Sequence, residues 1–296
     1  MATKSNLDKS LCYDVRPLKF VSTPLESYML EIFGASTIAV FIVLLVGFIW
    51  LKQQYQKKQQ LKSECLKHLL RLKKLMEYFQ YHRGLSARYL NGKTEVSDEL
   101  REKQRLIAQV LPSLALLARH SSLSEHWQAL LDHWQRLFAN NLSLTPEDNL
   151  AQHNRLINTL LYLIEDVTEL GYWSTRDHHK GIGSIVAILH TTEWIGQARA
   201  LGSGMLAANK RCDNDQSQMN LIQVKLELCL QQHSSNQESL DKLFQLKEII
   251  NQTFLQPLDE TSASISSHDY FVIASDAIES YLIEFDSIMG RLTQTH

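Results

Sequence analysis

Residues 61–92 read LKSECLKHLLRLKKLMEYFQYHRGLSARYLNG, and their apolar side chains recur mostly at steps of three and four. This is the spacing of one face of an α-helix. The apolar positions are Leu61, Leu66, Leu69, Leu72, Leu75, Met76 and Phe79. Since the chain has neither Pro nor Gly from Lys52 to Arg83, we expect one continuous helix over 52–92. Gly92 is a natural left-handed C-terminal cap for this helix.

More helices are expected toward the C-terminus. No Pro lies between Glu147 and Gln256, and the eleven Gly and five Pro of the chain are too few for many short strands and tight turns. Thr145 and Pro146 suit the cap and the first position of a helix. The expected helices span 97–120 with a kink at Pro112, 122–141, 146–171, 175–209, 215–233, 236–256 and 268–291. About eight helices without a strand predict an all-α chain with two stacked four-helix bundles.

Composition excludes several classes of protein. Hydrophobic residues make up 44% of the 296 residues, which is enough for a sizeable core. A net charge of −2 argues against a nucleic-acid binder that works by neutralising phosphates. The four cysteines show no CxxC spacing, so neither a zinc ribbon nor a disulfide framework is expected.

The stretch before the long helix, Ile32–Leu51, reads IFGASTIAVFIVLLVGFIWL and carries no charge. As a helix it is about 30 Å long, which matches the hydrocarbon core of a bilayer. A buried core helix this apolar needs cover on every side, and a signal peptide begins close to Met1. We therefore expect an N-terminal tail at 1–31, a transmembrane helix at 32–51, a stalk at 52–62 and an all-helical domain at 63–296.

Lysines flank this apolar stretch unequally. Within about 15 residues, Lys19 lies on the N-terminal side, whereas four lysines lie on the C-terminal side. These four are Lys52, Lys57, Lys58 and Lys62. The one apolar stretch predicts a single-pass protein in the lipid of a bacterial-type inner (plasma) membrane, and the positive-inside rule predicts its orientation. The tail is expected outside, and the C-terminal domain in the cytoplasm, where cysteines stay unpaired.

The chain also contains an internal echo. Residues 77–85, EYFQYHRGL, are similar to residues 193–201, EWIGQARAL, at an offset of 116. The offset pairs Glu77 with Glu193, Tyr78 with Trp194, Arg83 with Arg199, Leu85 with Leu201 and Leu90 with Leu206. Small residues follow both arginines, which lets another backbone or a small ligand approach closely. The two segments are therefore candidates for equivalent places in a duplicated fold.

The two arginines, Arg83 and Arg199, stand among apolar helix residues, so each needs a partner if its head is buried. One possibility is a salt bridge within the protein, for example to Glu77 or Glu193, and another is that the head reaches the surface. The third possibility is that the two arginines converge and share an anion. These alternatives stay open at the level of the residues.

Three segments carry a resemblance to a known family. LMEYFQYHRGLSARYLNG (75–92) resembles the ERGLSA-type signature of nitrate- and nitrite-sensing (NIT) domains, and EWIGQARALGSG (193–204) looks like the matching arginine helix. HNRLINTLLYLIEDV (153–167) resembles the helix that closes the first half of these domains. The resemblance covers roughly residues 60 to 290 and implies an all-helical pair of four-helix bundles.

The resemblance also implies a ligand site, because arginines on the long helices of the family bind nitrate or nitrite. Carried over, the anion-binding residues are Arg83 and Arg199, with Gly84 and Ser86 beside the first. A flat guanidinium with parallel N–H donors suits two oxygens of a planar oxyanion. This chain departs from the family at His82, where an acidic residue usually precedes the arginine.

No pattern of an enzyme or a cofactor site accompanies these features. The cluster Asp177-His178-His179 lacks the HExxH and CxxC contexts of metal sites, so we expect no metal. Ser86 and Ser203 lie in no GxSxG segment, and no Gly-rich loop follows a strand. We therefore expect neither catalysis nor a cofactor.

Three functions fit these observations. The first is a membrane-anchored sensor that binds nitrate or nitrite between two long helices and passes its state to a separate signalling partner, with a homodimer possible. A partner is expected because the sequence ends at His296 without an output module. The second is a membrane-anchored helical scaffold that binds no ligand. The third is a sensor of another small anion, such as a short carboxylate.

Overall fold

The computed structural model describes residues 24–171, 176–208, 212–232, 236–256 and 265–294. These residues form α-helices joined by short turns, and none of them lies in a strand, which confirms the all-α class. The helices are α1 (Pro24–Leu90), α2 (Ser97–Leu114), α3 (Ser121–Asn140), α4 (Pro146–Leu170), α5 (Arg176–Ala208), α6 (Asp213–Gln232), α7 (Gln237–Ile250) and α8 (Ser267–Gln294).

The predicted helix ends agree with the local chemistry. Gly92 follows α1 with φ at +90°, the left-handed value that favours glycine. Thr145 caps α4, because its hydroxyl accepts a hydrogen bond from the Asp148 backbone N–H at 3.1 Å, and Pro146 is the first helical residue. Pro112 lies inside α2, and the chain then tightens into a 3₁₀ turn at Ala115–Arg119.

The chain divides into two compact units, residues 1–57 and residues 58–296. Within the first unit, the described apolar side chains of α1 between Phe33 and Leu51 are exposed. In the part of the chain that the structure describes, α1 contains the one stretch that is long and apolar enough to cross a membrane. Of the expected tail at 1–31, residues 1–23 lie outside the described residues, and residues 24–31 belong to α1.

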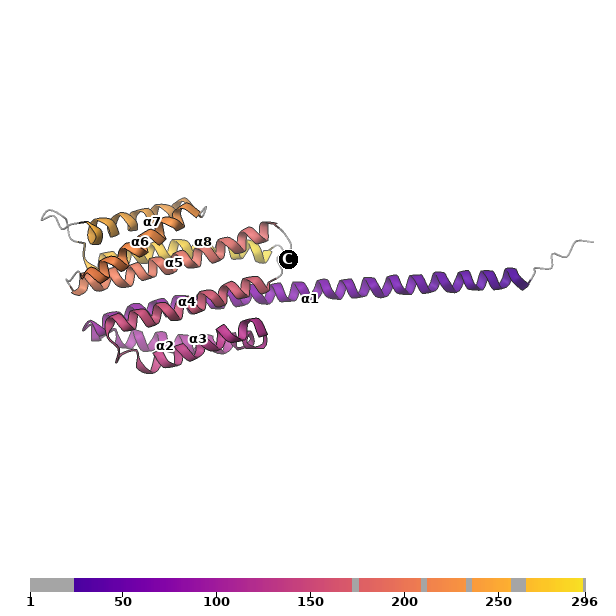
Figure 1. Ribbon diagram of the computed structural model, residues 1–296, viewed down its shortest axis with the longest axis horizontal. Helices are drawn as coiled ribbons and strands as arrows, with labels where there is room; N and C mark the ends of the chain where they lie inside the picture. Colours follow the sequence, from indigo (N-terminus) through magenta and orange to yellow (C-terminus); the bar gives the residue numbers. More distant parts are fainter. Residues whose placement is uncertain (1–23, 172–175, 209–211, 233–235, 257–264, 295–296) are drawn as a thin grey trace, which may run out of the picture. The chain divides into compact units, whose positions relative to one another are not determined.

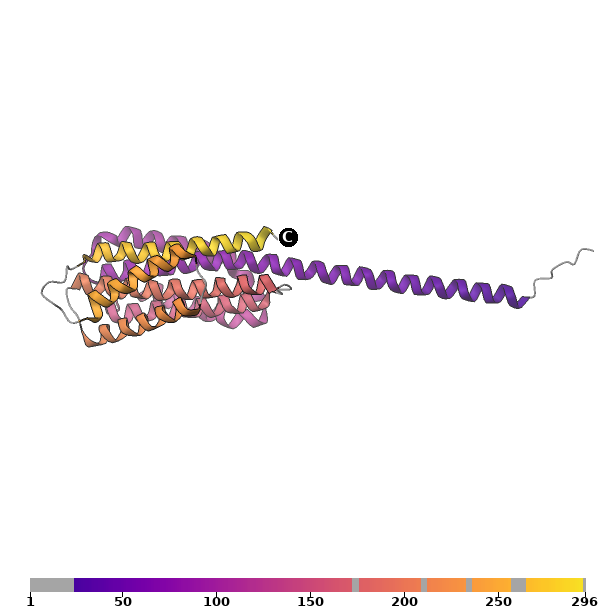
Figure 2. The same cartoon turned by 90° about the horizontal axis from the view of Figure 1, so that it is seen from above.

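The second unit contains the rest of α1 and all the other helices. Figure 1 shows α2, α3 and α4 beside the C-terminal part of α1, and α5, α6, α7 and α8 in a second group next to them. The view from above shows the helices of both groups running along a common direction (Figure 2). The two long helices of the internal echo, α1 and α5, therefore come from different groups.

The core of the second unit is continuous across both groups. The apolar positions predicted for 61–92 are buried except for Leu61, which is half-buried, and Leu69, Leu72 and Phe79 have no exposed surface. They join buried side chains of α4, α5 and α8, such as Ile164 and Phe285. Because this apolar face of α1 is covered by other helices, polar side chains on the same face are also removed from water. This packing sets the environment of the candidate site.

Candidate anion site

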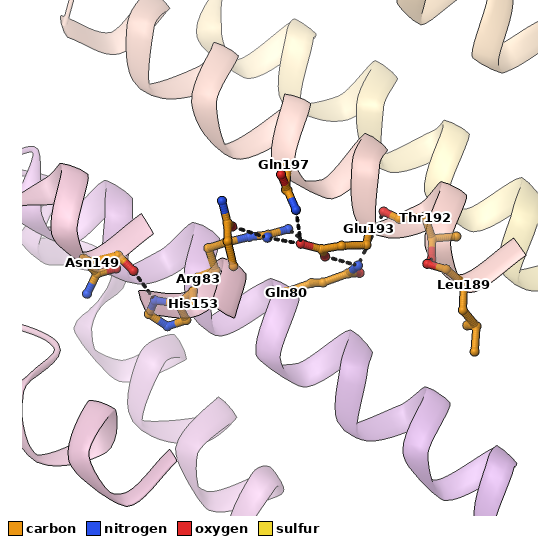
Figure 3. Close-up of polar contacts among 9 residues, drawn as sticks. Gln80, Arg83, Asn149, His153, Leu189, Thr192, Glu193 and Gln197 are labelled. Atoms are coloured by element: carbon orange, nitrogen blue, oxygen red, sulfur yellow. Dashed lines mark hydrogen bonds and ion pairs between the residues drawn. The ribbon is translucent and has the colours of Figure 1, made fainter. Parts of the chain in front are cut away.

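Arg83 lies on α1 with its side chain fully buried, and it forms an ion pair with Glu193 of α5 (Figure 3). Its Nη1 donates to Glu193 Oε1 at 2.6 Å and its Nη2 to Oε2 at 3.2 Å. Nη1 also donates to Asn154 Oδ1 of α4 at 2.7 Å, while the buried Nε has no hydrogen-bond partner among the described residues. The salt bridge to Glu193 considered from the sequence is therefore formed.

Two amides hold Glu193 from the other side. Gln80 Nε2 donates to Glu193 Oε2 at 3.0 Å, and Gln197 Nε2 donates to Oε1 at 2.9 Å. Both amides and the guanidinium of Arg83 point at one carboxylate in Figure 3. A buried carboxylate with this many donors is both neutralised and fully hydrogen-bonded.

Arg199 lies further along α5 and has no such partner. Its guanidinium makes cation–π contacts with two rings, since Cζ lies over the ring of Phe271 at 4.8 Å and over that of Tyr81 at 5.6 Å from the ring centroids. Its Nη1 donates to Ser275 Oγ of α8 at 2.9 Å. Among the described residues, no carboxylate lies within 4.0 Å of it, although only 4% of the residue is exposed.

Burial has an electrostatic consequence for Arg199. Desolvation, and after it the positive charge of Arg83, lower the pKa of Arg199 to about 10, against smaller opposing effects that include the Glu193 carboxylate. The group remains cationic at neutral pH. Arg199 is thus a buried positive charge that the described part of the protein does not neutralise, a costly arrangement in the absence of an anion.

Two cavities meet Arg199, one of about 410 Å³ and one of about 390 Å³. Both are bounded by residues of α1, α5 and α8, and Gln80 lines both of them as well. The larger cavity also contacts Gly84 and Phe271, and the smaller one contacts Ser275 and Glu77. Both cavities therefore offer a small ligand a place beside Arg199.

The four residues predicted as the anion site do not all meet. Gly84 and Arg199 line the larger cavity together. Arg83 lines neither cavity and turns its Nη atoms to Glu193. Ser86 is fully buried on the far side of α1, where its Oγ accepts a hydrogen bond from Asn141 Nδ2 at 3.2 Å. The structure therefore brings two of the four residues to one cavity.

His82, the departure from the family pattern, belongs to a buried histidine pair. Its Nδ1 lies 2.7 Å from Nε2 of His153, whose Nδ1 donates to the Asn149 backbone oxygen at 2.8 Å. Because that oxygen only accepts, His153 Nε2 is an acceptor and His82 Nδ1 carries the proton. Burial lowers the pKa of His82 to about 3, so both rings are neutral at pH 7 and neither contributes a positive charge to an anion.

Sequence reasoning missed the amides around the ion pair. Gln80 precedes Arg83 by about one helical turn, and Gln197 follows Glu193 by one turn. Each amide therefore lies on the same helix face as the charged residue one turn away. The side chains of Asp177, His178 and His179 lie outside the described part. Within the described residues, no three His, Cys, Asp or Glu side chains are grouped as a metal site.

Comparison with known proteins places the chain in a family. The model of the family described as "Nitrate and nitrite sensing" (NIT) matches residues 74–281, more than half of the chain. A similar solved structure is that of the NasR transcription antiterminator, with 17% sequence identity, a TM-score of 0.62, and 82% of this chain and 73% of that chain covered. At this identity the likeness shows the fold alone. No curated protein sequence matches the chain. The chain belongs to the nitrate and nitrite sensing family, whose role is sensory rather than catalytic.

Proposed function

We propose that this protein is a membrane-anchored sensor in which nitrate or nitrite binds against Arg199 and the bound state passes to a separate partner. Membership of the nitrate and nitrite sensing family gives the class of ligand. The position of the ligand and the anchoring to a membrane are inferences from the residues of this chain.

The observation that carries the site is the unneutralised charge of Arg199. The buried cluster holds two positive charges, Arg83 and Arg199, against one negative charge, Glu193. One negative ion beside Arg199 brings the net charge of this cluster to zero and offsets the repulsion between the two arginines. This repulsion is one cause of the lowered pKa of Arg199. Arg83 contributes to anion binding through its positive charge. Its buried Nε has no hydrogen-bond partner among the described residues.

The shape of the Arg199 site fits a planar oxyanion. The guanidinium lies over the rings of Phe271 and Tyr81, and such cation–π contacts use none of its N–H donors in a conventional hydrogen bond. The hydrogen bond to Ser275 uses one of five N–H donors, which leaves donors for two oxygens of one anion. Gly84 has no side chain to fill the larger cavity, whereas Ser86 is engaged elsewhere and takes no part in this proposal.

Signalling follows from the helices that surround the anion. The cavities are bounded by α1, α5 and α8, and each is far larger than an ion of four atoms. An anion that draws these helices together favours one of their arrangements, and differential binding is what shifts such an equilibrium. The small size of the ligand also limits its affinity, so closure of the helices around it strengthens binding.

The membrane anchor is the stretch 32–51 of α1. Its described side chains are apolar and exposed, a surface that water disfavours and lipid accepts. The lysines that follow it favour a cytoplasmic location for residues 58–296 and an outside location for the tail, in a bacterial-type plasma membrane. The output then passes to a cytoplasmic partner protein or through a homodimer, with no nucleic acid bound by charge alone.

A ligand-free scaffold is the second candidate, and the Arg83–Glu193 ion pair favours it because one of the two arginines already has an internal partner. Thermal unfolding of the full-length protein in detergent separates the two functions. A sensor gains stability with a saturable dependence on nitrate or nitrite, by about 2.7 kcal/mol at 100 times the dissociation constant. Chloride and sulfate at equal ionic strength report the general effect of salt, in which sulfate stabilises any folded protein. A scaffold shows only this general effect and no saturable gain in nitrate or nitrite.

A further inference from the structure

We propose that Glu193 determines which anions the Arg199 site accepts, by restricting it to ions with a single negative charge. The inference rests on the proposed function, since it concerns the specificity of the same site. It assigns Glu193 a role that its ion pair with Arg83 does not by itself require.

The first step is that Glu193 remains in place when an anion binds. Four hydrogen bonds end on its two oxygens, from two nitrogens of Arg83 and from the amides of Gln80 and Gln197. Its side chain is only 2% exposed. If the carboxylate moved away from these donors, no water would replace the lost hydrogen bonds. We therefore count Glu193 as a fixed negative charge of the site.

The second step is an asymmetry between the two echoed segments. Glu77 is the counterpart of Glu193 and lines the smaller cavity with Arg199, but it pairs instead with Lys73 at 2.8 Å and Lys74 at 2.8 Å. Lys73 also pairs with Asp286, so these two lysines and two carboxylates balance one another. Arg199 is thereby denied the partner that Arg83 has.

The remaining ionisable groups of the cavities lie nearer to solvent. Lys103 and Glu279 line the smaller cavity, and the larger one is lined by Arg88, Lys93, Glu95 and His268. Lys103 is half-buried and the others are exposed, so water and salt screen their charges. The buried cluster of Arg83, Arg199 and Glu193 therefore sets the charge balance at the anion.

The third step is the cost of a mismatch. One negative ion brings the buried cluster to zero, whereas a divalent ion leaves one negative charge uncompensated away from water. Such a residual charge rejects the wrong ligand even where its shape fits. Removal of the charge of Glu193 leaves the cluster with the two positive charges of Arg83 and Arg199, which a divalent anion neutralises.

The test compares perchlorate with sulfate, two tetrahedral oxyanions that differ in charge, together with nitrate. Calorimetric titration of the full-length protein in detergent uses the wild type, Glu193→Gln, and the control Glu165→Gln, which alters a partly exposed carboxylate paired with His190. We expect the affinity for sulfate relative to perchlorate to rise about tenfold or more in Glu193→Gln and to stay the same in the control. A ratio within about twofold of the wild type overturns the inference.

A second variant adds a negative charge to the buried cluster and tests the same proposal if Glu193→Gln does not fold. Gln80→Glu places another carboxylate in the cluster, and we expect it to weaken nitrate binding about tenfold or more relative to Gln80→Met. Equal nitrate affinity of these two variants contradicts the charge rule. If the wild type binds no nitrate while Glu193→Gln binds sulfate, the proposed function fails and the role of Glu193 stands.

Discussion

Arg83 and Arg199 carry the same charge in the same buried region, but their surroundings differ in kind. The guanidinium of Arg83 pairs with the Glu193 carboxylate, whereas that of Arg199 lies over aromatic rings and donates to one serine hydroxyl. Loss of a partner from a buried ion pair strands a charge, but loss of an unpaired buried charge strands nothing. At the scale of the residue, the two arginines are therefore expected to affect stability differently.

The substitutions Arg83→Met and Arg199→Met test this difference in ligand-free protein. Arg83→Met leaves Glu193 without its cation and is expected to lower the free energy of unfolding by about 3–5 kcal/mol. Arg199→Met removes an uncompensated charge and is expected to be neutral or stabilising. Urea denaturation of full-length protein in detergent measures both. Equal destabilisation by the two variants argues against an unneutralised Arg199.

The buried histidine pair predicts an acid-sensitive fold. In the unfolded chain a histidine titrates near 6.5, but burial lowers the pKa of folded His82 to about 3 and that of His153 well below 6.5. Below pH 6.5 the unfolded state therefore binds more protons, so stability is present above this pH and is lost as the pH falls toward 3. His82→Gln should reduce the slope of unfolding free energy against pH by about 1.4 kcal/mol per unit between about pH 5.5 and 4. An unchanged slope in urea denaturation shows that His82 is not buried in its neutral form.

At the scale of the element, α5 approaches its neighbours through glycines. A Cβ on Gly196 meets Nη2 of Arg83 at 2.7 Å, and a Cβ on Gly202 meets the ring of Tyr270 at 2.5 Å. Tyr270 of α8 is fully buried, and its hydroxyl donates to the Ala198 backbone oxygen at 3.0 Å. Gly202, one of the small residues that follow Arg199, thus brings α5 close to α8, and Gly196, which precedes Arg199, brings α5 close to α1.

Gly202→Ala should separate α5 from α8. The added methyl group overlaps Tyr270, and the cost of overpacking, about 1–3 kcal/mol, outweighs the gain in helix propensity of about 1 kcal/mol. The control is Gly183→Ala on the same helix, where nothing lies within 4 Å and a small stabilisation is expected. Thermal unfolding compares the two variants. A Gly202→Ala protein as stable as Gly183→Ala contradicts this packing.

The elements themselves followed from periodicity, because each helix buries one apolar face. The expected helix at 175–209 corresponds to α5 (Arg176–Ala208), and the one at 122–141 corresponds to α3 (Ser121–Asn140). Local chemistry also gave the caps at Thr145 and Gly92. The π-helical turn at Asn251–Leu255 was missed, since it replaces the last turn of an expected α-helix without a break in the apolar pattern.

The site was less accessible to sequence reasoning than the helices were. The type of residue at Arg83 and Arg199 shows that each needs a partner, but which carboxylate reaches which arginine depends on the packing of α1 against α5. Glu77 and Glu193 were equal candidates in the sequence, yet only Glu193 reaches a buried arginine, because Lys73 and Lys74 take Glu77. His82 departs from the family pattern at the position before Arg83, and its burial keeps it neutral.

At the scale of the whole molecule, the apolar stretch of α1 and the helical unit at 58–296 are expected to be stable in different environments. The first exposes apolar side chains over residues 36–51, while the second buries its apolar residues in its own core. The proposed membrane anchor meets both requirements, with lipid around the first and water around the second.

Arginines in the apolar stretch should detach the protein from the membrane. Leu44→Arg with Leu45→Arg adds two charges near the centre of the span, each at a cost of about 2.5–3.5 kcal/mol for insertion. We expect the wild type in the carbonate-washed membrane pellet and this double variant in the supernatant. The control is Leu221→Arg with Leu228→Arg on exposed positions of α6, which should stay with the membrane. Wild-type protein in the supernatant contradicts anchoring.

The central claim is that nitrate binds to the guanidinium of Arg199. Its most direct measurement is a calorimetric titration of nitrate into full-length protein in detergent, with Arg199→Lys beside the control Arg155→Lys at an exposed position of α4. Lysine keeps the charge but loses the planar fork, so we expect saturable binding in the wild type and in Arg155→Lys, and affinity about tenfold lower or worse in Arg199→Lys. Absence of binding to the wild type, or equal affinity in all three proteins, would contradict the claim.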